Sequence, residues 1–82
     1  MTRFYSTLRY FKRRDRKEIE KDLTSLDIAI LTRTGIKGAD YYEILNACRP
    51  YVGRNGVKFF ASSDQVKTRI KILKQKNLLE IG

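Results

Sequence analysis

Apolar residues recur at helical spacing in three stretches of the chain, most clearly at 62–77. Val66, Ile70 and Leu73 lie at i, i+4 and i+7 and therefore share one face of a helix. A serine at 62 or 63 supplies an N-cap, because its hydroxyl oxygen accepts a hydrogen bond from the first turn. Asn77 is a suitable left-handed residue to end the helix. The opposite face is polar and carries Asp64, Lys67, Thr68, Lys71 and Gln75.

The second stretch, 16–34, has its apolar residues spaced by four, three and four. They are Ile19, Leu23, Leu26 and Ile30. The segment Thr24 to Asp27 also resembles a helix-capping signal, so the stretch is either one continuous helix or two helices joined near Thr24. Gly35 is expected to end it.

The third stretch, 39–49, predicts a helix that begins at Ala39 or Asp40. Its inward face carries Ile44, Leu45 and Cys48. Pro50 ends it, because the residue before a proline is pushed out of the helical region. Only Ile36 and Lys37 lie between Gly35 and Gly38, so this segment is long enough only for a bend or a two-residue strand. Residues 78–81 are expected to form a short strand that leaves the 62–77 helix.

Two segments leave alternatives open. Residues 3–14 suit either a helix or a strand, and form either a basic arm on nucleic acid or a buried packing and dimerisation segment. Residues 50–61 contain Gly-Arg-Asn-Gly between two valines, which is hairpin chemistry. The segment is either a small hairpin that approaches phosphate or a long turn held to the core by Phe59 and Phe60.

The stretch 62–79 resembles the recognition helix and first wing strand of winged helix-turn-helix proteins. In that family the helix ends in a leucine, two or three polar residues, a glycine and an aliphatic residue. Here these places are taken by Leu73, by 74–76, by Asn77 and by Leu78, with asparagine in place of the glycine. The resemblance implies a mainly α fold with minimal β, in which the wing is truncated or absent. It also implies a homodimer on a palindromic DNA site.

Composition indicates one small domain with a polyanionic partner. The chain has 82 residues, a net charge of +9 and a pI of about 10.0. One cysteine excludes an internal disulfide and fits a reducing compartment, so we expect a cytoplasmic protein. No segment is apolar over the length of a membrane span. We divide the chain into a basic aromatic arm at 1–14 and a winged-helix domain at 15–82.

The positive charge is concentrated in two regions. Residues 1–16 hold six basic groups and one acid, and residues 49–76 hold eight basic groups and one acid. Residues 17–48 hold four basic groups and six acids. Charge that served only solubility would be spread more evenly.

These patterns predict sequence-specific binding of double-stranded DNA by a transcription regulator, with the 62–77 helix in the major groove. An RNA-binding protein, such as a component of the small ribosomal subunit, is the alternative. The expected DNA-binding residues are Ser63, Gln65, Lys67, Thr68, Lys71 and Lys74 on the helix, Arg54 and Lys58 in the 50–61 segment, and Arg13 and Arg14 in the arm.

The sequence offers no site for catalysis, a metal or a cofactor. It has no histidine and one cysteine, so zinc sites of the usual kind and His-dependent catalytic triads cannot be built. No complete Gly-rich phosphate loop is present. We therefore expect a binding protein rather than an enzyme. We also expect it to dimerise through Phe4, Tyr5, Leu8, Tyr10 and Phe11, which are too many large apolar side chains for an exposed arm.

Overall fold

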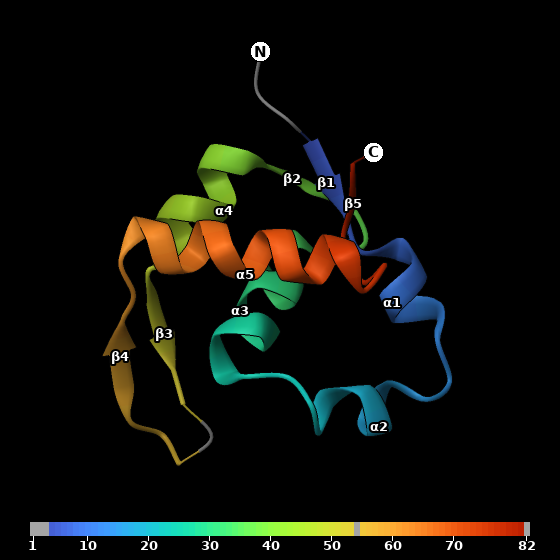
Figure 1. Ribbon diagram of the computed structural model, residues 1–82, viewed down its shortest axis with the longest axis horizontal. Coiled ribbons are helices and arrows are strands. Elements are labelled where there is room, and N and C mark those ends of the chain that lie inside the picture. Colours follow the sequence, from blue (N-terminus) through green and yellow to red (C-terminus); the bar gives the residue numbers. More distant parts are fainter. Residues whose placement is uncertain (1–3, 54, 82) are drawn as a thin grey trace.

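A computed structural model describes residues 4–53 and 55–81, which form five helices and five short strands (Figure 1). The helices are α1 (Leu8–Lys12), α2 (Arg16–Glu20), α3 (Ser25–Thr34), α4 (Tyr41–Ala47) and α5 (Ser63–Gln75). The strands are β1 (Phe4–Ser6), β2 (Ala39–Asp40), β3 (Pro50–Val52), β4 (Lys58–Phe60) and β5 (Glu80–Ile81).

The strands form two antiparallel sheets. In the first sheet β1 lies between β2 and β5, and Tyr5 pairs with both Ala39 and Ile81. In the second, β3 and β4 form a hairpin in which Tyr51 lies opposite Phe59. The first sheet therefore joins the two ends of the chain, as Figure 1 shows.

The predicted fold class is therefore wrong. We expected a mainly α winged helix-turn-helix with a truncated or absent wing, whereas the chain folds as α+β with five strands in its described part. Strands of two or three residues are too short to show the alternation by which a strand is recognised in a sequence. Their partners are also distant, because β1 pairs with strands about 35 and 75 residues away.

Helix boundaries follow local capping. Residues 16–34 form two helices, because Thr24 and Asp27 make a reciprocal capping box at the start of α3. The Asp40 carboxylate caps α4 by accepting a hydrogen bond from the backbone N–H of Glu43. Gly35 ends α3 with a φ of 62°, as the sequence predicted. The minimal strand lies at Ala39–Asp40 rather than at 36–37, which belong to a turn.

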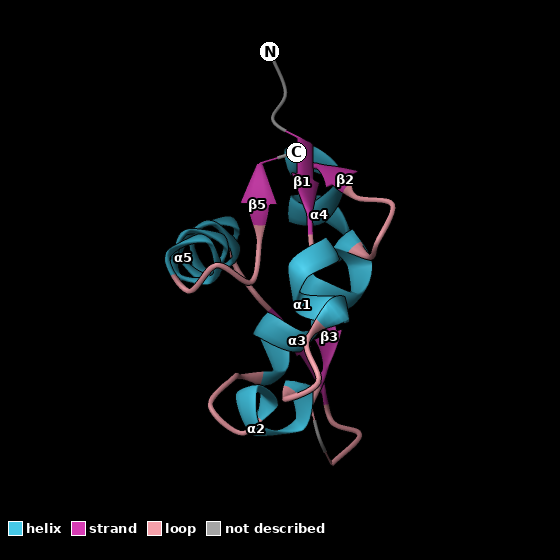
Figure 2. Ribbon diagram, turned by 90° about the vertical axis from the view of Figure 1, so that its right-hand side faces the viewer, coloured by secondary structure: helices cyan, strands magenta, loops and turns pink. Residues whose placement is uncertain are grey.

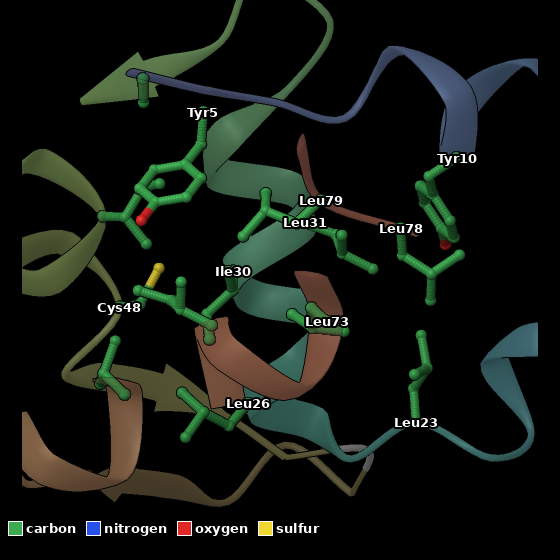
Figure 3. Packing of buried hydrophobic residues seen from close by; sticks show 14 of the residues in the cluster. Tyr5, Tyr10, Leu23, Leu26, Ile30, Leu31, Cys48, Leu73, Leu78 and Leu79 are labelled. Carbon is green, nitrogen blue, oxygen red and sulfur yellow. The ribbon is translucent and has the colours of Figure 1, made fainter. Parts of the chain in front are cut away.

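The core is formed where α3, α5 and the three-stranded sheet meet (Figure 3). Ile30 of α3 and Leu73 of α5 are fully buried, and Tyr5 of β1 enters the same cluster. Cys48 is also buried, which raises the pKa of its thiol to about 11, and its sulfur lies 3.6 Å from the carbonyl oxygen of Ala29. This confirms that Cys48 is a buried residue and shows that its thiolate is disfavoured.

The first described residues belong to this core. Tyr5 and Tyr10 are buried, and the Tyr10 hydroxyl donates a hydrogen bond to Glu20 at 2.5 Å. Burial and this bond raise the pKa of Tyr10 to about 12. Phe4 and Leu8 remain exposed. The described part of the segment at 3–14 is thus a strand, Phe4–Ser6, followed by a helix, Leu8–Lys12, and part of its aromatic content is buried within the same chain.

None of the helices in residues 4–53 and 55–81 has the length and apolar character needed to cross a membrane.

Candidate nucleic-acid interface

The candidate interface is built on α5, which begins at a reciprocal capping box. The Ser62 hydroxyl accepts a hydrogen bond from the backbone N–H of Gln65, and the side-chain carbonyl of Gln65 accepts one from the backbone N–H of Ser62. The helix ends before Asn77, whose φ of 61° is left-handed. Backbone N–H groups of Leu78 and Leu79 then donate to the carbonyl of Leu73, which closes the C-terminus. Both ends of the helix are therefore fixed by local hydrogen bonds.

The two faces of α5 are clearly separated, as the sequence predicted. Val66, Ile70 and Leu73 are at most 3 % exposed and face the core. The outward side chains are all exposed, and they are Asp64, Lys67, Thr68, Lys71 and Gln75. In Figure 2, α5 lies at one side of the molecule, next to β5 of the three-stranded sheet. The helix thus packs its inner face on the core and leaves one polar face exposed, and an exposed helix face is what a DNA major groove can admit.

An ion pair between a partly exposed arginine and a buried carboxylate holds α5 against α3. The Arg69 guanidinium donates two hydrogen bonds of 2.6 Å to the carboxylate of Asp27, and this raises the pKa of Arg69. Asp27 is fully buried, and its carboxylate also accepts a hydrogen bond of 3.0 Å from the backbone N–H of Thr24. One carboxylate thus caps α3 and fixes the position of α5. The sequence reasoning missed this pair, because Asp27 looks like an ordinary first-turn acid.

The uncharged candidates on α5 already make hydrogen bonds. Gln65 uses its side-chain oxygen in the cap, so its amide N–H groups remain for a ligand. The Thr68 hydroxyl donates to the carbonyl of Asp64 at 2.9 Å, one turn back, and leaves the methyl group for outward contact. Ser63 is half-buried at the first helical position. The Ser-x-x-Gln spacing of the capping box was readable in the sequence and was missed.

The lysines of α5 differ in their surroundings. Lys67 and Lys71 are exposed, and neither forms an ion pair with a residue that the structure describes. Lys74 is half-buried, with its ammonium 5.9 Å from the centre of the Tyr5 ring. Lys67 and Lys71 are therefore the two most available cations on the outward face.

The remaining candidates flank α5 at its two ends. Lys58 is exposed on β4, which leads into the N-terminus of α5. Arg13 and Lys76 line one small cavity, which places Arg13 at the C-terminal end. Arg13 makes two 3.0 Å hydrogen bonds to Asp15, which lower the pKa of that carboxyl, and Arg14 is exposed. Arg54 lies outside the described residues.

A shallow groove of about 390 Å³ runs between the first half of α5, the start of α3 and the hairpin. Gln65 and Thr68 line it on one side and Tyr51 lines it on the other. Two of the expected reading residues thus face a depression rather than a flat surface. The ring of Tyr51 stacks on that of Phe59 at a centroid distance of 5.4 Å.

For residues 50–61 the hairpin itself is confirmed, and the expected role of the phenylalanines is wrong. Val52 pairs with Lys58, so a hairpin forms as the Gly-Arg-Asn-Gly segment predicted. Phe59 and Phe60 do not hold it to the core, because they are 47 % and 70 % exposed. The sequence could not show this, because burial depends on which distant surfaces meet in the folded chain.

Comparisons of this chain with family models, with curated proteins and with solved structures found no match. The resemblance of 62–79 to winged-helix proteins therefore stays a prediction. Within residues 4–53 and 55–81, no three His, Cys, Asp or Glu side chains come together in a group that could hold a metal ion.

Proposed function

We propose that this protein binds double-stranded DNA with sequence preference and acts as a transcription regulator, with α5 in the major groove. The observation that carries this proposal is the outward face of α5. It is a 13-residue helix, held to α3 by the ion pair between Arg69 and the buried Asp27, and it presents exposed Lys67, Thr68 and Lys71. An α-helix fits the major groove, where the donor and acceptor pattern differs for every base pair.

The chemistry of the face suits base contact in its N-terminal half. The Thr68 methyl group can meet the methyl group of thymine, and the amide N–H groups of Gln65 can donate to a base or a phosphate. Lys67 and Lys71 can reach the guanine edge or hold phosphate. Ser63 lies at the helix N-terminus, where a backbone N–H and a hydroxyl suit a phosphate oxygen.

The basic residues at the two ends of α5 would hold the DNA backbone on both sides. In Figure 1, β4, which carries Lys58, leads into the N-terminal end of α5, and α1 lies toward its C-terminal end. Arg13, which follows α1, lines a cavity with Lys76 at that C-terminal end, and Arg14 is the next residue in the chain. Two copies bound on a palindromic site would double these contacts. The compartment that suits the buried, unpaired thiol of Cys48 is the reducing cytoplasm.

Selection of binding sites from a random duplex pool, followed by titration of the selected and scrambled duplexes, tests this proposal. We expect Lys67→Ala and Lys71→Ala each to weaken binding about tenfold at low salt, because each removes a charged contact. Lys37→Ala, which removes an exposed charge in the turn between α3 and β2, is the matched control and should bind as wild type does. A pool from which no sequence is enriched would remove the sequence-specific proposal.

RNA binding is the second candidate, favoured by the exposed rings of Phe59 and Phe60 on the hairpin. Proteins that bind RNA in a sequence-specific way stack unpaired bases on such rings. Titration of a structured RNA hairpin beside the selected duplex separates the two candidates. Tighter binding of the RNA at equal salt would make RNA the principal ligand.

A further inference from the structure

The β3–β4 hairpin presents two faces of different character. Tyr51 and Phe59 are cross-strand partners on the face toward the groove, where Tyr51 packs against the core. Side chains alternate along a strand, so Pro50 and Phe60 lie on the other face. Val52 and Lys58 lie on that same outer face as the next pair. We call these four residues the outer hairpin face.

The outer hairpin face is apolar and exposed. Val52 is 58 % exposed and Phe60 is 70 % exposed, the highest value among the large hydrophobic residues of the described part. Val52 and Phe60 therefore expose apolar surface on the same face of the hairpin, and a contiguous exposed apolar patch marks an interaction site where a single exposed residue does not. Backbone hydrogen bonds close both ends of the hairpin. The Gly53 N–H donates to the carbonyl of Val57 at 2.7 Å, and the Ala61 N–H donates to the carbonyl of Arg49 at 2.7 Å.

A cation lies against the exposed ring. The Arg49 guanidinium lies 4.8 Å from the centre of the Phe60 ring, and its Nε donates to the carbonyl of Ala61 at 3.3 Å. Arg49 therefore lies over the Phe60 ring, which nevertheless remains 70 % exposed. Lys58 adds a second exposed cation two residues away on the same face.

The charge around the hairpin decides which occupant fits it. No acidic residue occurs between Glu43 and Asp64, whereas Arg49 and Lys58 lie in this interval. A second copy of the chain placed on the same face would bring like charges together, which is unfavourable. A polyanion that carries flat apolar groups complements this face, because its negative charges pair with the cations and its flat groups stack on the ring. Single-stranded nucleic acid has both, and aromatic side chains beside cations are how proteins hold it.

We propose that the outer hairpin face stacks Phe60 on an unpaired nucleobase, while Arg49 and Lys58 hold the adjoining phosphates. The proposal rests on the proposed function of α5, because the hairpin leads directly into the N-terminus of that helix. Together they would select DNA in which a duplex adjoins an unpaired segment. A blunt duplex offers the hairpin no accessible base face except at its ends.

Three fluorescent probes test this proposal on the full chain. They are a blunt duplex, the same duplex with an unpaired thymidine tail, and the same duplex with an abasic tail of equal length. The two tailed probes carry equal charge, so their affinity ratio reports contact with bases alone. We expect the wild type to prefer the thymidine tail over the abasic tail by about tenfold.

Variants at Phe60 identify the contact. Phe60→Ala and Phe60→Leu should both lose the preference for bases, whereas Phe60→Trp should keep it, because only Trp retains a flat ring. None of the three should change binding of the blunt duplex. Tyr42→Ala, which removes an exposed ring on α4, is the matched control and should retain the preference.

Each other outcome has a definite meaning. Equal affinity for the two tailed probes, or a preference that survives in Phe60→Leu, would overturn the stacking proposal and leave duplex binding by α5 standing. Binding of the tail with no binding of the blunt duplex would overturn the proposed function of α5 and retain the stacking surface. A wild-type dimer that Phe60→Ala converts to a monomer would show that a second copy occupies the outer hairpin face, which would also overturn the stacking proposal.

Discussion

Gln65 has two possible roles at the start of α5, and they can be separated by substitution. Its side-chain oxygen closes the capping box, and its amide N–H groups remain for a ligand. We expect Gln65→Ala to lower the free energy of unfolding by about 1 kcal/mol and to relax preference at one base. Gln65→Glu keeps the acceptor, so it should retain the stability and lose only the base contact.

Urea denaturation of both variants, beside competition between duplexes that differ at one base, measures the two roles separately. If both variants retain the wild-type ranking of duplexes, Gln65 serves the helix alone.

Thr68 offers its methyl group because its hydroxyl is bonded to the carbonyl of Asp64. Thr68→Val keeps the methyl group, so we expect the wild-type preference for thymine. Thr68→Ser keeps the hydroxyl and removes the methyl group, and should lose about 1 kcal/mol of preference for thymine over uracil at one position. Titration of duplexes with thymine or uracil at each position measures this. If Thr68→Ser kept the preference for thymine and Thr68→Val lost it, the contact would belong to the hydroxyl.

At the scale of elements, the pair between Asp27 and Arg69 determines how α5 sits on α3. Arg69→Met should lower the free energy of unfolding by about 3–5 kcal/mol, because it leaves the buried carboxylate of Asp27 without its cation. The double variant Asp27→Asn with Arg69→Met should recover most of this loss, since the asparagine oxygen can still cap α3.

Chemical denaturation of the two single variants and the double variant gives this coupling energy. Additive losses would show that the pair contributes little to the docking of α5.

At the scale of the whole molecule, a net charge of +9 should make DNA binding strongly dependent on salt. Each phosphate contact contributes a slope of about −0.9 to the log–log plot of affinity against salt, and we expect on the order of six contacts across a dimer. Lys67→Ala removes one cationic side chain and should make the slope shallower by about 1 for each phosphate that this lysine holds. Titration at several salt concentrations measures the slope. An affinity that is unchanged between low and moderate salt would contradict this prediction.

The sequence alone determined the helical character of three amphipathic stretches, and it placed the end of one at Gly35 and the end of another at Asn77. It left open the break within 16–34 and the choice between a hairpin and a long turn at 50–61. The signals that the sequence offered are local: Gly35 and Asn77 adopt positive φ, and a proline at 50 predicted that the third helix would stop before it. That helix, α4, ends at Ala47, two residues earlier than expected. The inward and outward faces of α5 were also predictable, because side-chain direction on a helix depends only on position. The capping box of Ser62 and Gln65 was equally local and could have been found.

Only the tertiary structure decided what depends on residues far apart in the chain. It pairs β1 with β2 and β5, which makes the fold α+β, and it buries Asp27 against Arg69. It also leaves Phe60 in solvent, although an aromatic side chain of this size would suit a core. Neither strand pairing nor burial can be read from neighbouring residues, because both depend on which distant surfaces meet and how much apolar area they already cover.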